Sequence, residues 1–321
     1  MTLLRYPLSA IRHINRKCGK TLNMSEEQVQ YFGQQANDII REKLAINLKN
    51  KTGYMIAKFG TYELDTILFY TQKNTGIQAY ADMIHGVRRI YWKDLKRHLP
   101  NMGFFPLEQK ACKQFSELYC NDIPLIDILG SYQRGEIFLG HMLKEAIKVN
   151  LEGYYAPYLW NTPWTKTLAG KKVLVVHPLT ESIQRQYARR KKLFDNPEVL
   201  PEFKELLTVK AVQSIAGNKP EQFETWFDAL DYIKQEISAK DFDIALIGCG
   251  AYGLPLSAHV KRMGKIAIHL AGWTQMLFGI YGNRWLLEQT KFKQFINEYW
   301  IRPALSETPV NAITIENACY W

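Results

Sequence analysis

Short apolar runs alternate with amphipathic stretches along the second half of the chain. Between two such runs, Trp226, Leu230 and Ile233 recur at the three- and four-residue steps of one helix face. Short strands separated by single helices favour parallel pairing through right-handed crossovers. Residues 171–285 therefore predict a Rossmann-like, doubly wound α/β fold with a mainly parallel sheet. The four runs that resemble buried strands are 172–176, 208–213, 243–247 and 265–270.

The first half of the chain has mainly helical patterns. A capping box at Ser25–Gln28 predicts the start of a first helix. Further helices are expected over 77–99 and near 136–149, and the one apparent strand spans 54–59.

These patterns predict a helical N-terminal extension and one α/β domain. The extension covers 1–50, and the domain covers 51–321. Within the domain, a helical segment over 77–150 precedes the strand-helix repeats of 171–285. A chain of 321 residues that is 47% apolar is long enough for one such domain.

Composition and the distribution of apolar residues indicate where in the cell the protein is expected. No stretch reaches the roughly 18 uninterrupted apolar residues of a membrane span, and the N-terminus lacks a signal-peptide pattern. The five cysteines are scattered, which favours neither a disulfide framework nor a structural zinc site. We therefore expect a cytoplasmic protein.

The charge is strongly basic, with 41 basic and 31 acidic residues and a net charge of +10. Basic clusters at 88–97 and 185–192 are typical of contact with phosphates or with an anionic membrane face, or of solvated helix surfaces. Because no nucleic-acid-binding motif accompanies them, no nucleic-acid partner is expected.

The expected fold indicates where a ligand binds. In an open parallel sheet, ligands occupy the crevice beyond the carboxyl ends of the strands. The segments expected there are rich in Gly, Ser, Thr and Gln, which suits a phosphorylated, nucleotide-containing ligand, although glycine also serves ordinary strand-helix turns. These segments are 60–63, 177–182, 213–218, 248–253 and 271–275.

The turn at 248–253 fits the pattern G-x-G-x-x-G. A dinucleotide site would also need an acidic residue at the end of the next strand, to hold the ribose hydroxyls. That strand ends at His269 without a carboxylate. We therefore expect no NAD, which argues against an oxidoreductase, and no haem.

Three titratable residues are candidates for catalysis. Thr61 can cap the helix that follows it, which places Glu63 in the first turn, either facing the crevice or complementing the helix dipole. His177 and Glu181 flank the next loop and can supply a base or bind substrate hydroxyls, although a histidine at a strand end also serves structure. The usual hydrolase and metalloprotease signatures are absent from the sequence.

Two segments resemble a known family. Residues 55–64 resemble the R-F-G-D-G-E segment of bacterial glycosyltransferases with the GT-D fold, whose D-x-E motif engages a metal and the diphosphate of a sugar nucleotide. Residues 243–253 are similar to the later strand and glycine turn of that family. Residues 50–321 also resemble a group of proteins found around bacterial surface-polysaccharide genes, through 176–183, 210–217, 298–303 and 319–321.

The chain departs from the family at one acid. Thr61 stands where the D-x-E motif has its first carboxylate, so that only Glu63 remains as a metal ligand. Mg²⁺ or Mn²⁺ would then depend on the phosphates of the ligand. Alternatively, basic residues replace the metal as counter-charge, with Arg134 and Arg185 as candidates.

The resemblance implies a sugar-nucleotide-dependent glycosyltransferase that extends a surface glycan at the inner face of the cell membrane. A UDP-sugar is the expected donor, with a glycan or lipid-linked acceptor. Glu63, His177 and Glu181 are the expected catalytic residues. The alternative is a non-catalytic nucleotide- or glycan-binding protein of a polysaccharide assembly system. The residues expected to bind the nucleotide sugar are Gly60, Thr61, Tyr62, Ser182, Arg185, Gly248, Gly250, Tyr252, Gly253, Thr274 and Gln275.

Aromatic residues add a further expectation. Tyr252 and Trp273 either stack on a base or sugar ring or serve in packing. The C-terminal aromatic tail either closes the site or docks on the core. Its residues are Trp300, Arg302, Tyr320 and Trp321.

Overall fold

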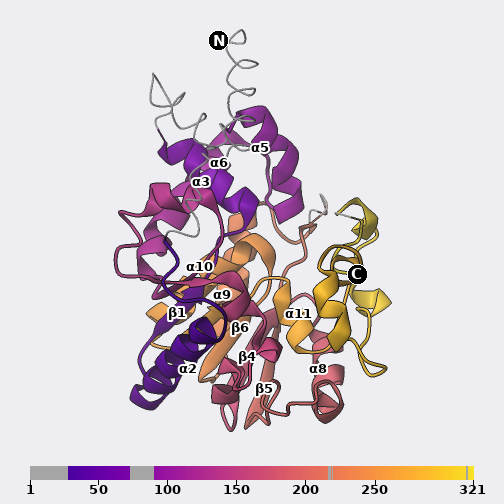
Figure 1. The fold of residues 1–321 in the computed structure, drawn as a ribbon. Coiled ribbons are helices and arrows are strands. Elements are labelled where there is room, and N and C mark those ends of the chain that lie inside the picture. Colours follow the sequence, from indigo (N-terminus) through magenta and orange to yellow (C-terminus); the bar gives the residue numbers. More distant parts are fainter. Residues whose placement is uncertain (1–27, 73–89, 216–217, 219, 316) are drawn as a thin grey trace, which may run out of the picture.

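A computed structural model describes residues 28–72, 90–215, 218, 220–315 and 317–321. A seven-stranded sheet in the order β3-β2-β1-β7-β6-β4-β5 forms its centre (Figure 1). All neighbouring strands are parallel, which confirms the predicted α/β class and doubly wound sheet. The strands are β1 (Tyr54–Ala57), β2 (Ile128–Ser131), β3 (Ile147–Asn150), β4 (Lys172–His177), β5 (Glu205–Lys210), β6 (Ile244–Ile247) and β7 (Ile266–His269).

Helices cover both faces of this sheet (Figure 1). The two faces form separate apolar cores, because alternate strand residues point in opposite directions. Leu174 of β4 joins the core that includes α3, α6, α9 and α10, and Val175 joins the core that includes α2, α8 and α11. The α-helices include α2 (Gly33–Asn50), α3 (Thr61–Thr71), α5 (Trp92–His98), α6 (Gln109–Asp122), α7 (Leu151–Tyr155), α8 (Thr180–Ala188), α9 (Trp226–Ser238), α10 (Gly253–Arg262) and α11 (Trp273–Leu277). Within the described ranges, none of the helices has both the length and the apolar character that crossing a membrane requires.

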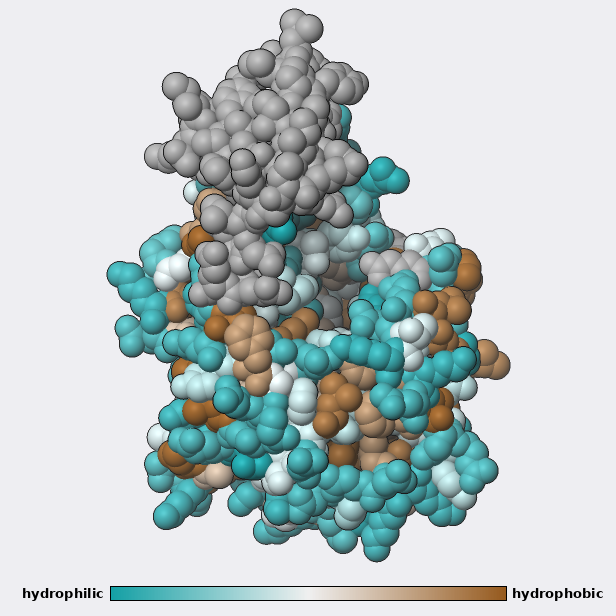
Figure 2. Space-filling view, viewed as in Figure 1, coloured by the Kyte–Doolittle hydropathy of each residue, from teal (hydrophilic) through white to brown (hydrophobic). Residues whose placement is uncertain are grey.

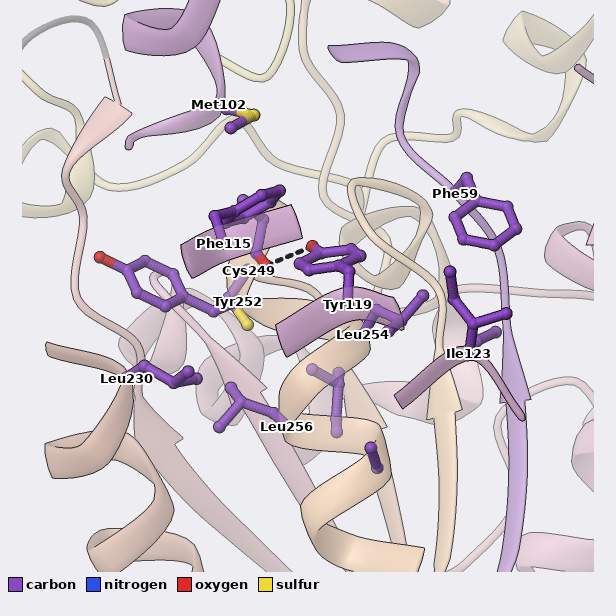
Figure 3. Packing of buried hydrophobic residues seen from close by; sticks show 14 of the residues in the cluster. Phe59, Met102, Phe115, Tyr119, Ile123, Leu230, Cys249, Tyr252, Leu254 and Leu256 are labelled. Carbon is purple, nitrogen blue, oxygen red and sulfur yellow. Dashed lines mark hydrogen bonds between the residues drawn. The ribbon is translucent and has the colours of Figure 1, made fainter. Parts of the chain in front are cut away.

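Figure 3 shows part of the first core, where α6 packs against the start of α10. The buried Tyr119 hydroxyl donates a hydrogen bond of 2.6 Å to the carbonyl oxygen of Ala251. Leu254 and Leu256 of α10 lie beside it in the same core. This packing and the hydrogen bond to Ala251 hold the glycine turn at 248–253 against α6.

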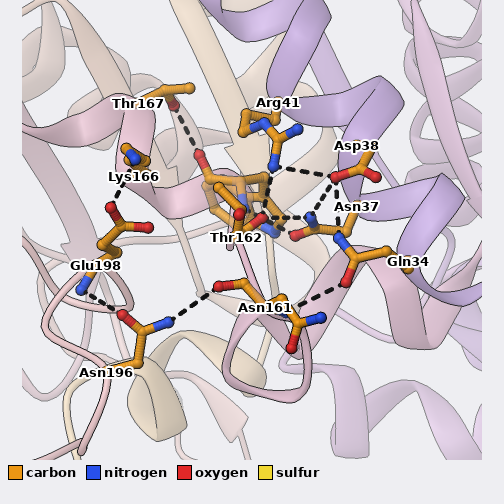
Figure 4. Close-up of polar contacts among 11 residues, drawn as sticks. Gln34, Asn37, Asp38, Arg41, Asn161, Thr162, Lys166, Thr167, Asn196 and Glu198 are labelled. Atoms are coloured by element: carbon orange, nitrogen blue, oxygen red, sulfur yellow. Dashed lines mark hydrogen bonds and ion pairs between the residues drawn. The ribbon is translucent and has the colours of Figure 1, made fainter.

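Polar contacts join α2 to the segment that precedes β4 (Figure 4). The Asn37 side chain accepts a hydrogen bond from the Trp164 backbone N–H (2.8 Å) and donates one to the Thr162 carbonyl oxygen (2.7 Å). Arg41 donates to the same carbonyl oxygen (2.9 Å). Because the apolar face of α2 is also buried in the second core, residues 33–50 of the predicted extension pack directly onto the sheet.

The direction in which successive strands are added to the sheet reverses between β4 and β6, which are parallel neighbours. From β4 it continues through α8 to the edge strand β5, and from β6 it continues through α10 to β7. Ile183 of α8 and Leu256 of α10 lie in the two different cores, so these helices cover opposite faces. Such a switch point opens a crevice beyond the carboxyl ends of the strands.

Some predicted elements are wrong. The helical segment expected over 77–150 contains β2 and β3, and the helix expected near 136–149 is a 3₁₀ helix over Arg134–Leu139 followed by β3. β2 and β3 have four residues each, which is too short for a clear period. The strand expected at 208–213 begins three residues earlier, as β5.

The start of the first helix is also displaced. The helix begins at Gly33, after Phe32, which provides no side-chain cap. Most of the capping box at Ser25–Gln28 and residues 77–89 of the helix expected at 77–99 lie outside the described residues. The remainder of the latter is helical as α5.

The C-terminal segment lies beside α11, in yellow in Figure 1. Its outer side exposes Leu305 and Val310, which are 92% and 97% accessible, and hydrophobic residues are visible at the same edge in Figure 2. Its inner side buries Ile315 and Trp321 in a small core. The segment therefore forms an added wall at the carboxyl edge of the sheet.

Candidate ligand-binding site

A cavity of about 320 Å³ lies at the carboxyl ends of the central strands. The loops after β1, β4, β5, β6 and β7 all contribute to its wall. Residues from outside these loops also line it, among them Met102, Tyr132, Arg284 and Tyr320. Its volume lies within the usual range for small-molecule sites, and its position is the one expected for the ligand of a doubly wound sheet.

Glu63 is held at this cavity by the start of α3. The N-cap of α3 is Gly60 and no side chain caps the helix, so the predicted capping role of Thr61 is wrong. Glu63 lies in the first turn and is only 7% exposed. A Cβ atom added to Gly60 would lie 1.8 Å from Glu63 Oε2, so glycine is required for the carboxylate to fold back over the helix start. Gly60, Thr61 and Tyr62 line the same cavity.

Lys58, which follows β1, is a cation whose charge acts on the pKa of Glu63. Burial raises the pKa of the Glu63 carboxyl, and the positive charge of Lys58 partly opposes this effect. The Lys58 ammonium lies 5.6 Å from the ring centre of Tyr132 and 3.4 Å from the carbonyl oxygen of Phe59. A carboxyl group with a raised pKa beside a cation can both exchange a proton and bind a polar ligand.

His177 lines the cavity as a neutral ring. Its Nδ1 accepts a hydrogen bond from the Leu179 backbone N–H (3.0 Å), so the ring proton resides on Nε2. Burial lowers the pKa of His177 to about 3. The ring is therefore arranged to donate a hydrogen bond rather than to accept a proton.

The N-terminus of α8 is already occupied by a carboxylate of the protein. Glu307 accepts hydrogen bonds from the backbone N–H groups of Glu181 (2.8 Å) and Ser182 (3.1 Å), and is 2% exposed. Helix N-termini favour anions, and here Glu307 fills that position. Glu181, Ser182 and Arg185 lie outside the residues that line the cavity, and the Glu181 side chain is 60% exposed near Lys210.

The glycine turn after β6 is mostly filled by side chains. A Cβ atom on Gly248 would lie 2.4 Å from Thr274 Oγ1, and one on Gly253 would lie 2.1 Å from His269 Nε2. Gly250 has a positive φ of 56° and no neighbour closer than 3.6 Å to an added Cβ atom. Gly248 and Gly250 line the cavity, whereas Gly253 and Thr274 do not, so room for a phosphate near the turn is restricted to Gly250.

The aromatic rings expected to stack on a ligand are stacked on protein rings. Tyr252 lies parallel to Trp226, with ring centres 4.8 Å apart, and Trp273 lies parallel to Tyr155 at 3.8 Å. Tyr252 still lines the cavity, and its hydroxyl contacts Ser214 Oγ at 3.0 Å. Both rings therefore serve in packing.

The C-terminal tail forms part of the cavity wall. Tyr320 and Trp321 line the cavity, and Arg302 donates a hydrogen bond of 2.6 Å to the Trp321 carbonyl oxygen. Gln275 also lines it and donates to the Tyr320 carbonyl oxygen (3.0 Å). Trp300 instead binds the Leu193 carbonyl oxygen through its indole N–H (2.9 Å), within the second core.

Sequence reasoning missed two cations of the site, Lys58 and Arg284. A basic residue directly after a strand was the available signal for Lys58. Arg284 has no local signal, because the fold brings it to the cavity from a segment far along the chain. Arg134, the expected counter-charge, begins the 3₁₀ helix after β2 and does not line the cavity.

The described residues do not form a complete protein-only site for Mg²⁺ or Mn²⁺. In substrate sites Mg²⁺ is usually held by one or two carboxylates together with waters and substrate phosphates. Glu63 is the only Asp or Glu side chain among the described residues that line the cavity, so such an ion would depend on the phosphates of a ligand. Over the whole described part of the chain, no three His, Cys, Asp or Glu side chains are grouped as a metal site.

Comparisons with models of known families, with curated protein sequences and with solved structures give no match to this chain. The geometry of the cavity therefore carries the functional argument.

Proposed function

We propose that the protein transfers a sugar from a nucleotide sugar, with a UDP-sugar as the first candidate, to a hydroxyl group of a glycan or lipid-linked acceptor. The observation that carries this proposal is the buried Glu63 carboxyl at the carboxyl edge of the sheet, in a cavity that also presents Lys58 and Arg284. A carboxylate and cations in one cavity suit a reaction that removes a proton and releases a phosphate. The family resemblance of residues 55–64 supports the same assignment.

The proposed reaction is a displacement at the anomeric carbon. The acceptor oxygen forms a bond to this carbon while the bond to the phosphate oxygen breaks, and the leaving nucleoside diphosphate takes the electron pair. Glu63 accepts the proton of the acceptor hydroxyl. The pKa of Glu63 is raised by burial, which makes its carboxylate a stronger base. His177 donates a hydrogen bond to substrate oxygens through Nε2.

A second candidate is a binding protein that recognises a nucleotide or glycan without turning it over. The specific observation in its favour is the single carboxylate in the described cavity wall, since the family resemblance leads one to expect two. Under this hypothesis Glu63 is a ligand-binding group and not a base.

A panel of UDP-, GDP-, dTDP- and CMP-sugars separates the two hypotheses. The melting temperature identifies the donor that binds, and nucleotide release in the presence of a glycan acceptor reports turnover. Transfer predicts catalytic release from the donor that stabilises the protein. Stabilisation with no transfer or hydrolysis, with and without Mg²⁺ or Mn²⁺, would support the binding protein instead.

A further inference from the structure

The cavity has more positive than negative groups. Lys58 and Arg284 line it, and Glu63 is the only Asp or Glu side chain among its described lining residues. Even with this carboxylate ionised, the two cations outnumber it. The excess positive charge favours an anionic ligand.

Lys58 stays charged in this setting. Burial lowers the pKa of its ammonium, but Tyr132 and Glu63 raise it, and the net direction is upward. No carboxylate of the described residues lies within ion-pair distance of the Lys58 nitrogen, although Glu63 is near enough to affect it. An ammonium that is partly buried without a direct ion pair is available to a ligand anion.

Arg284 lines the same cavity as Lys58. Its guanidinium lies 4.5 Å from the ring centre of Tyr320 and donates a hydrogen bond of 3.0 Å to the Tyr320 hydroxyl. This stacking fixes the plane of the guanidinium. The positive charge of Arg284 acts on the pKa of Lys58, so the two cations lie within electrostatic range of each other.

We infer that Lys58 and Arg284 together bind the diphosphate of the nucleotide ligand and do so without a metal ion. The Arg284 guanidinium supplies a planar set of N–H donors that matches phosphate oxygens, and Lys58 supplies a compact charge beside it. Between them they neutralise the two phosphates that a divalent cation would otherwise bridge. The inference rests on the proposed function, because it names the part of the donor that these residues hold.

Calorimetric titration of the full-length protein with UDP and with inorganic pyrophosphate, in EDTA, tests the inference. Both probes are expected to bind without a metal. Lys58→Gln is expected to raise the dissociation constant of each probe by about tenfold or more, because one charge-assisted contact is lost. Lys58→Arg, which keeps the charge, is expected to stay within about threefold of the wild type.

Controls separate charge from folding. Lys113→Gln removes an exposed lysine of α6 and is expected to leave both affinities unchanged. Arg284→Lys keeps the charge and removes the planar donors. It is therefore expected to lower the affinity for UDP and to leave the affinity for uridine unchanged. Melting temperatures verify that each variant is folded.

The inference is overturned if neither probe binds, if EDTA abolishes binding that Mn²⁺ restores, or if folded Lys58→Gln binds both probes like the wild type. Its failure differs from failure of the proposed function. Metal-free UDP binding that depends on Lys58, with no turnover of any nucleotide sugar, would retain the inference and reject the transferase. Turnover that needs Mn²⁺ and is unchanged in Lys58→Gln would retain the transferase and reject the inference.

Discussion

Buried polar residues at the carboxyl edge of the sheet differ in how they are satisfied. Glu307 receives backbone N–H groups from α8 and thus has defined partners. His177 has a defined partner at Nδ1. Both ring nitrogens of His269 are buried with no hydrogen-bond partner among the described residues. These hydrogen bonds hold Glu307 and His177 in one orientation. We therefore expect substitution of either residue to change the free energy of unfolding.

Glu307→Gln is expected to lower the free energy of unfolding by about 1–3 kcal/mol. The amide keeps the size of the side chain but removes the negative charge from the α8 N-terminus and places an NH₂ group near backbone donors. Chemical denaturation measures the loss. Glu145→Gln, at an exposed position, serves as the control. An unchanged free energy of unfolding would show that the carboxylate does not hold this helix start.

Histidine burial predicts a pH effect on stability. The pKa values of His177 and His269 are lowered to about 3 by burial, whereas an unfolded histidine has a pKa of about 6.5. The unfolded chain therefore binds more protons than the folded one below about pH 6.5. The contribution of these rings to stability is fully present above that pH and is lost as the pH falls toward 3, by up to about 1.4 kcal/mol per pH unit for each ring.

His177→Gln is accordingly expected to show a shallower loss of stability than the wild type between pH 6.5 and pH 5. Denaturation curves at several pH values give the difference in the free energy of unfolding between the two proteins. The contributions of the other titrating groups are common to both and cancel in this difference. His141→Gln, at an exposed position, is the control. Parallel pH profiles of the wild type and His177→Gln would contradict the neutral buried ring.

At the scale of elements, the long amphipathic and fully apolar segments were predictable and the short ones were not. α9 begins at the Thr225 capping box and buries its periodic face as expected. β4, β6 and β7 are continuous apolar runs buried on both faces. β2 contains Gly130 and β3 is an edge strand of four residues, so tertiary pairing decides both.

Asn150, at the end of the unpredicted β3, joins three elements. Its Oδ1 accepts hydrogen bonds from the backbone N–H groups of Gly33 (2.9 Å) and Gly153 (3.2 Å), at the starts of α2 and α7. Asn150→Ala is expected to lower the free energy of unfolding by about 1–2 kcal/mol. Chemical denaturation beside Asn311→Ala, an exposed asparagine, tests this. Equal stabilities of the two variants would refute the capping role.

At the scale of the whole molecule, the sequence allowed the position of the cavity to be predicted but not which side chains line it. The strand order brings the loops after β1, β4, β6 and β7 together, as a doubly wound sheet requires. Which side chains enter the cavity depends on packing. Gly253 accommodates His269, and Glu307 covers the start of α8, so two expected phosphate positions are filled by the protein. Arg284 and the C-terminal tail reach the cavity only through the tertiary fold.

The most direct test of the central claim is the rate of nucleotide release by wild type and Glu63→Gln, each saturated with the donor sugar that stabilises the protein and supplied with acceptor. We predict similar donor-induced melting shifts for both proteins and a rate at least about 100-fold lower for Glu63→Gln, as for loss of a general base. Glu181→Gln, which removes an exposed carboxylate outside the cavity wall, should keep the wild-type rate. A Glu63→Gln protein that binds the donor and releases nucleotide at the wild-type rate would contradict the account.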